Sequence, residues 1–180
     1  DAEYAIEGDT SSASYFVGAD FLQRLAHPES SQRIEVANWP HSGWQFDERF
    51  AAFCALPTAD PKAAAAELER CVQLGCKGAM IHGLSMGKFL DEPEFDCIWE
   101  RAQALDVPIY LHPSSPVPAV AEAYYKDYLD RFPQLLTAAW GYTVETATQG
   151  IRMVLSGCFD QYPRLKIILG HLGESLPFSA

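Results

Sequence analysis

Three of the five histidines follow short apolar segments, at the place where each segment would end as a strand. His171 comes just after the apolar residues of 165–169, and Glu174 lies three positions further on. His112 follows residues 107–111 in the same way. Imidazole is the commonest protein ligand for zinc and similar cations, and a nearby carboxylate can share a proton with it. The pattern therefore indicates a metal-binding or proton-transferring site that contains His112, His171 and Glu174.

The other histidines give weaker signals. His82 follows a third apolar segment, residues 77–81, but Gly83 comes next and predicts an irregular loop. A histidine after a strand is often a loop residue that bonds only to the backbone, and this reading is favoured for His82. His27 precedes a proline and His41 lies in an aromatic, Gly/Pro-punctuated stretch, so neither is assigned a chemical role.

The segments that carry these histidines are predicted to be buried strands. Residues 165–169 are apolar, rich in β-branched side chains and bounded by Pro163 and Gly170, which is typical of a strand and too short for a helix. Residues 77–81 and 107–111 follow the same pattern, and residues 50–56 are apolar enough for a fourth strand.

Amphipathic helices are predicted between these strands. One begins at Asp60-Pro61 and stops at Gly75, and the next runs from Pro93 to the residue before Pro108. A further helix is expected to begin at Thr143 and to bury its most apolar residues, which are Val144, Ala147, Ile151, Val154, Leu155 and Cys158. Strands that alternate with helices pair in parallel, so their carboxyl ends meet at one rim.

The first fifty residues are less regular. A strand is expected to end over 4–6, a polar loop follows over 8–14, and 21–25 is typical of a helix turn. Residues 38–46 predict an aromatic loop. We treat the chain as a single domain, 1–180, as its length favours.

Composition excludes several functional classes. The chain has 13 Lys and Arg against 24 Asp and Glu, a net charge of −11, and no basic patch, so nucleic acid and anionic membranes are poor partners. No apolar run is long enough to cross a membrane. The five cysteines form no CxxC pair, which predicts reduced thiols and a cytoplasmic protein.

Four motifs give a resemblance to a known family. They are R-F-A-A-F-C-A-L-P at 49–57, E-L-E-R-C-V at 67–72, V-P-I-Y-L-H-P at 107–113, and F-D-Q-Y-P-R-L-K-I-I-L-G-H-L-G-E-S-L-P at 159–177. Over roughly residues 48–178 the chain resembles the amidohydrolase-related decarboxylases. These include the γ-resorcylate, 2,3-dihydroxybenzoate and salicylate decarboxylases, and aminocarboxymuconate semialdehyde decarboxylase is a more distant relative.

The resemblance implies an α/β fold of the (β/α)8 TIM-barrel type and the nonoxidative loss of carbon dioxide from a hydroxybenzoate-like acid. His112 and His171 match the family's metal ligands, and Glu174 with His171 matches its proton-handling residues. Asp1 is a candidate carboxylate ligand. The implied cofactor is a divalent metal, zinc or manganese, and the implied partners are an aromatic carboxylic acid and further copies of the chain. A cation and a positioned acid suit this chemistry, because the ring carbon must be protonated before carbon dioxide leaves.

The chain also departs from the family pattern. A full barrel has eight strands and takes roughly 250 residues, whereas four strands are predicted here. Residues 1–49 match the family poorly, and the family's late aspartate would lie beyond Glu174. The expected fold is thus a partial or truncated barrel. Two alternatives stay open: a hydrolase of the same superfamily that activates water on its metal, or a noncatalytic relative that associates with other subunits through exposed strand edges.

A few further residues are candidates by type alone. Tyr110, Tyr142, Trp140 and Phe178 either line a pocket for an aromatic acid or fill the core. Arg152 is a weak candidate to bind a substrate carboxylate. Glu145 is interpreted as a favourable charge in the first turn of its helix.

Overall fold

The computed structural model of the chain describes residues 10–35 and 53–179. By their internal contacts the residues divide into two compact units, 1–52 and 53–180. The single domain expected over 1–180 stays a prediction. No helix in the described ranges combines the length and the apolar character needed to cross a membrane.

The first unit contains one described helix, α1 (Thr10–Ala26). The helix turn predicted at 21–25 is confirmed, but the loop predicted over 8–14 is wrong from Thr10 onward. Residues 10–20 contain no proline, and helix propagation adds one hydrogen bond per residue once a nucleus exists, so the helix extends upstream. Asp20 binds Arg24 at 2.9 Å and accepts a hydrogen bond from Ile34 N at 2.9 Å, which ties the following segment to α1. The strand predicted over 4–6 lies outside the described residues.

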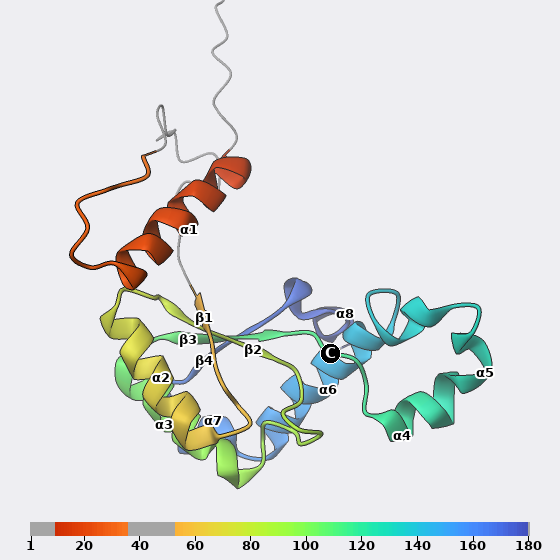
Figure 1. The fold of residues 1–180 in the computed structure, drawn as a ribbon. Coiled ribbons are helices and arrows are strands. Elements are labelled where there is room, and N and C mark those ends of the chain that lie inside the picture. Colours follow the sequence, from red (N-terminus) through yellow and green to blue (C-terminus); the bar gives the residue numbers. More distant parts are fainter. Residues whose placement is uncertain (1–9, 36–52, 180) are drawn as a thin grey trace, which may run out of the picture. The chain divides into compact units, whose positions relative to one another are not determined.

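The second unit is built on a four-stranded parallel sheet (Figure 1). Its strands lie in chain order, β1 (Phe53–Ala55), β2 (Gly78–His82), β3 (Pro108–His112) and β4 (Lys166–Leu169). Ile81 pairs with Leu111, and Leu111 pairs in turn with Leu169. The strands predicted from the apolar segments are confirmed. β1 ends at Ala55, one residue before the predicted end, and the predicted residues 50–52 lie outside the described ones. His82 and His112 are the last residues of their strands rather than the first after them.

Two helices and the inward side chains of the central strands form the core. Asp60 caps α2 (Pro61–Gln73) by accepting hydrogen bonds from Lys62 N and Ala63 N, both at 3.1 Å, as its sequence predicts. The 3₁₀ turn η2 (Pro93–Phe95) leads into α3 (Asp96–Leu105). The core members with almost no exposed surface include Ala64, Leu68, Ala79, Ile98, Trp99, Ala102 and Ile109.

A run of short helical turns follows β3. These are α4 (Pro118–Val120), the π-turn η3 (Ala121–Tyr125), α5 (Lys126–Leu129) and the 3₁₀ turn η4 (Pro133–Leu136). They lead to α6 (Gly141–Leu155), α7 (Cys158–Gln161), the turn η5 (His171–Gly173) after β4, and α8 (Leu176–Ser179).

The buried face of α6 matches the predicted one only in part. Ala147 is buried, as is Cys158 at the start of α7, but Ile151 is 45% exposed. Val154 and Leu155 are 62% and 80% exposed, whereas Glu145, Gln149 and Met153 are buried. These three are spaced four residues apart and therefore share one helix face. The apolar side chains alone predicted the wrong roll of the helix, because the segments packed against α6 include polar atoms that its sequence does not reveal.

Candidate active site

The three strand-end histidines lie together at the carboxyl edge of the sheet. The ring centroids of His82 and His112 are 4.4 Å apart, and those of His112 and His171 are 5.5 Å apart. Parallel register explains this closeness, since His82 pairs directly with His112 across β2 and β3. The sequence assigned His82 to a loop, and the structure places it beside the predicted pair. The chemical roles of the three remain predictions.

The ring of His112 is oriented by its own backbone neighbour. Its Nδ1 lies 2.8 Å from the carbonyl oxygen of Pro113, which acts only as an acceptor. This contact favours the tautomer that carries the proton on Nδ1 and leaves the Nε2 lone pair available. A neutral imidazole with a free Nε2 is the form that binds a metal ion.

His171 and Glu174 form a close pair. Nδ1 of His171 lies 2.7 Å from Oε1 of Glu174, whose side chain is only 12% exposed. The other carboxylate oxygen, Oε2, accepts a hydrogen bond of 2.9 Å from the hydroxyl of Thr143. The contact of Oε1 with His171 is short but is not aligned as a hydrogen bond, so Oε1 is buried without a donor. An unsatisfied carboxylate oxygen beside an imidazole suits a bound cation or a mobile proton.

The backbone after β4 holds this pair in an unusual conformation. His171, Leu172 and Glu174 all have positive φ, at 48°, 59° and 53°. Bulky side chains rarely adopt the left-handed region, and such strained residues often gather at functional sites. The conformation turns His171 and Glu174 toward each other while Leu172 is 94% exposed.

The start of α6 completes the site. The ring of Tyr142 lies 6.4 Å from those of both His112 and His171, and Tyr110 lies 6.4 Å from His112. Thr143 was expected to cap this helix, but α6 begins at Gly141 and Thr143 instead donates to Glu174 across 31 positions of sequence. No local signal distinguishes a cap from such a contact, because both use the same hydroxyl at a helix start.

Other predicted candidates lie elsewhere. Arg152 does not reach this site, since its guanidinium binds both oxygens of Asp91, at 2.8 and 2.9 Å. Trp140 is about half exposed. Asp1, His41 and the side chain of Phe178 lie outside the described residues.

The described side chains fit part of a metal site. The available Nε2 of His112 and the adjacent ring of His171 are nitrogen ligands of the kind that zinc and manganese accept. Within residues 10–35 and 53–179, however, no group of three or more His, Cys, Asp or Glu is placed to hold a metal ion. The assignment of His112 and His171 as metal ligands therefore stays a prediction.

Comparison with known proteins decides the family. The model of the amidohydrolase family matches residues 37–177. The chain belongs to this family. The chain is 47% identical over 138 residues to a γ-resorcylate decarboxylase of Polaromonas sp. strain JS666, a match that covers 73% of the chain and 41% of the relative.

Solved structures agree. The chain superposes with a TM-score of 0.67, at 37% identity, on a dihydroxybenzoic acid decarboxylase from Polaromonas sp. JS666 with bound manganese and the inhibitor 2-nitroresorcinol. The match covers 96% of this chain and 48% of that one. A 2,6-dihydroxybenzoate decarboxylase in complex with 2,6-dihydroxybenzoate gives a TM-score of 0.65 at 36% identity, covering 97% and 49%.

These findings confirm the predicted resemblance and the predicted fold class. The second unit is a four-stranded parallel sheet with helices between its strands. This arrangement corresponds to part of a (β/α)8 barrel. The chain spans about half the length of the relatives it matches.

Proposed function

We propose that this chain provides part of the active site of a metal-dependent, nonoxidative decarboxylase that acts on a hydroxybenzoate-like aromatic acid. The observation that carries the proposal is the contact between His171 and Glu174 beside the ring of His112, at the carboxyl edge of a parallel sheet. The similarity to decarboxylases of dihydroxybenzoates supports the choice of substrate class.

The reaction requires a proton at the ring carbon that bears the carboxyl group. His171 and Glu174 are the proposed catalytic residues, because Nδ1 and Oε1 lie 2.7 Å apart and need only a rotation of the side chains into line to share a proton and deliver it. When that carbon gains the proton, the carbon–carbon bond breaks, its electron pair returns to the ring, and carbon dioxide leaves. Thr143 fixes the carboxylate of Glu174 during this transfer through the bond to Oε2.

His112 and His171 are the proposed metal ligands, with Asp1 as the proposed carboxylate ligand. A bound zinc or manganese ion supplies positive charge for the carboxylate and adjacent hydroxyl of the substrate. The rings of Tyr110 and Tyr142 flank His112 and offer apolar walls to an aromatic ring.

The test combines metal content with product formation. Elemental analysis of the purified chain is compared with His112→Ala and His171→Ala, and resorcinol formed from 2,6-dihydroxybenzoate is measured. We expect bound zinc or manganese in the wild type, its loss in both variants, and loss of product. Glu174→Gln should keep the metal and lower the rate by about 10²- to 10⁴-fold, as removal of an acid catalyst does.

His27→Ala is the matched control. The side chain of His27 is exposed, and its Nδ1 lies 3.5 Å from Oε1 of Glu29 in an ion pair at the surface. It should change neither metal nor rate. A wild-type chain without metal and without product formation would exclude the decarboxylase proposal for this polypeptide.

Location and assembly are also proposals. A cytoplasmic location is supported by the cysteines, since all five are free thiols and the cytosol keeps thiols reduced. Association with further copies is supported by exposed apolar side chains, of which Leu155 and Leu172 are 80% and 94% exposed. Light scattering of the purified chain measures this association.

A further inference from the structure

A third histidine, His82, lies against the proposed pair of metal ligands. It ends β2 and pairs in register with His112 at the end of β3, so both side chains project from the same face of the sheet. Their ring centroids are 4.4 Å apart, and the rings are inclined by only 36°. Rings that lie nearly face to face leave each other's nitrogen edges uncovered. A small molecule bound at His112 would therefore lie beside the ring of His82 as well.

The ring of His82 is bonded differently from the rings of the other two histidines. Nδ1 of His112 lies 2.8 Å from the carbonyl oxygen of Pro113. Nδ1 of His171 lies 2.7 Å from Glu174. Within residues 10–35 and 53–179, no protein group forms a hydrogen bond or an ion pair with the ring of His82, which is an exposed residue. A neutral imidazole has one N–H donor and one lone pair, so both are available to a ligand.

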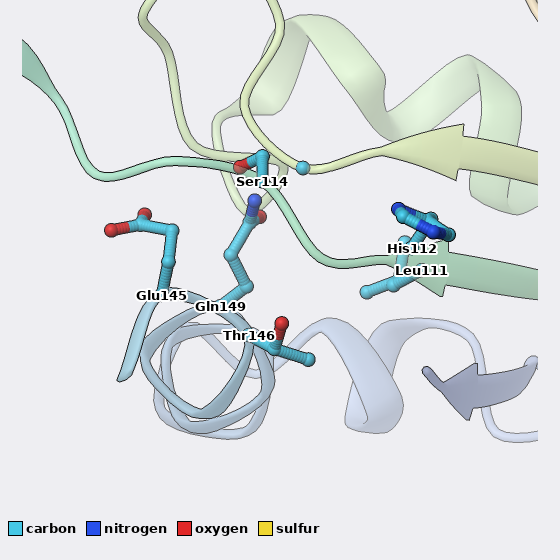
Figure 2. A pocket seen from close by; sticks show the side chains of 7 residues that line it. Leu111, His112, Ser114, Glu145, Thr146 and Gln149 are labelled. Carbon is cyan, nitrogen blue, oxygen red and sulfur yellow. The ribbon is translucent and has the colours of Figure 1, made fainter. Parts of the chain in front are cut away.

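The turn after β2 holds His82 in a fixed place. Gly83 has positive φ, at 44°, and its N–H donates to the carbonyl of His112 at 3.0 Å. A Cβ at Gly83 would collide with the side chain of Ser114, which Figure 2 shows in the loop that follows His112. The ends of β2 and β3 are thereby joined directly beside both histidines. A side chain on a fixed backbone binds a ligand at a small cost in entropy.

A hydroxybenzoate with two hydroxyls beside its carboxylate needs a partner of this kind. The proposed function assigns the carboxylate and one adjacent hydroxyl of such an acid to the metal. The second adjacent hydroxyl loses water when the acid binds, and it then needs a hydrogen-bond partner from the protein. An imidazole suits it in either tautomer, because a phenol hydroxyl can both donate and accept.

We propose that His82 binds the second ortho hydroxyl of a 2,6-dihydroxybenzoate-like acid and thereby determines the preference for this class of substrate over monohydroxybenzoates. The inference rests on the proposed function for the place where the acid binds. A site that forms a hydrogen bond to a substrate hydroxyl rejects the analogue without it, since the polar group of the site then stays unpaired. In this role His82 determines specificity and takes no part in the proton transfer.

Two acids that differ by one hydroxyl test the role of His82. Titration calorimetry measures the Kd of 2,6-dihydroxybenzoate and of 2-hydroxybenzoate for the full chain in buffer with zinc. We expect the wild type to bind the dihydroxy acid about tenfold more tightly, the effect of roughly one hydrogen bond. His82→Phe keeps a ring against His112 but has no polar edge. It should bind both acids equally, with a Kd for 2-hydroxybenzoate within about twofold of the wild-type value.

His82→Asn and His27→Phe are the comparison variants. The amide of asparagine both donates and accepts, so His82→Asn should keep at least part of the preference. His27 is an exposed histidine without a proposed role, and His27→Phe should leave both Kd values unchanged. Should His82→Phe fail to fold, His82→Ala removes the same polar edge and should lose the same preference.

Several results would contradict the inference. A wild type without a preference, an unchanged preference in His82→Phe, or the loss of both acids in His82→Phe each excludes a discriminating role. A wild type that binds neither acid excludes it too.

Product formation separates this inference from the proposed function. Binding with the expected preference but without release of carbon dioxide keeps the role of His82 and excludes decarboxylation by this chain. Turnover with the same selectivity in the wild type and in His82→Phe keeps the proposed function and excludes the role of His82.

Discussion

At the scale of single residues, Glu145 has the largest difference between its expected and observed environment. Its place near a helix start predicts an exposed carboxylate that interacts with the helix dipole. The structure buries it on the face of α6 that points to the loop after β3, and its Oε1 has no donor from the protein. Removal from water favours the neutral form, so the pKa of Glu145 is raised above its ordinary value of 4.5.

Glu145→Gln should therefore change how stability depends on pH. Because the folded protein binds the proton of Glu145 more tightly than the unfolded chain, this residue makes the free energy of unfolding fall as pH rises from about 4.5 through the folded-state pKa. The glutamine variant lacks this fall, so its stability relative to the wild type should increase over that pH range. Urea unfolding at a series of pH values measures it.

Glu122→Gln is the control for that experiment. Glu122 is exposed and pairs with Lys126 at 2.7 Å on the surface, an interaction worth at most about 1 kcal/mol. Equal pH profiles for wild type and Glu145→Gln would show that the carboxyl of Glu145 titrates as it does in the unfolded chain.

At the scale of elements, β2 packs so closely between its neighbours that one position excludes any side chain. A Cβ at Gly78 would lie 2.7 Å from the Phe53 ring and closer still to the carbonyl oxygen of Pro108. Phe53 belongs to β1 and Pro108 to β3, and the backbone oxygen cannot rotate away as a side chain can. The close approach of three strands is therefore encoded in one glycine.

Gly78→Ala should lower the free energy of unfolding by about 2–3 kcal/mol, the usual range for overpacking a core. Gly87→Ala is the matched control. Unlike Gly78, Gly87 has positive φ, at 78°, and nothing lies within 4 Å of the added carbon, so we expect a cost of only about 1 kcal/mol from backbone strain. Denaturant unfolding compares the two, and equal costs would contradict the steric argument.

At the scale of the whole second unit, Arg152 joins segments far apart in the sequence. It extends from α6 to Asp91, in the loop after β2, and its guanidinium also lies 4.1 Å from the centre of the Phe89 ring. Asp91 is mostly buried, at 13% exposed, while the arginine is partly open to solvent at 41%. This contact accounts for an arginine that the sequence named as a candidate to bind a substrate carboxylate.

Arg152→Lys should destabilise the protein although it keeps the charge. Lysine cannot bind both oxygens of Asp91 and stack on Phe89 at once, so we expect a loss of about 1 kcal/mol after allowing for solvent screening. Arg131→Lys is the matched control, since Arg131 lies 5.1 Å over the ring of Phe132, its neighbour in sequence, and should cost less than about 0.5 kcal/mol. Thermal unfolding of both variants checks the difference, and an unchanged Arg152→Lys would show that charge alone is sufficient.

The sequence alone determined the strands, the helices between them and the histidines at the strand ends. Apolar runs bounded by proline and glycine, and a cap such as Asp60, act within a few residues, and alternation of strands and helices requires parallel pairing. His112 and His171 were therefore expected at one edge, where the structure places them. Only the tertiary structure decided which face of α6 is buried and that Thr143 reaches Glu174. Those contacts join side chains from distant segments, and local patterns of polarity do not specify how a helix rolls against a loop.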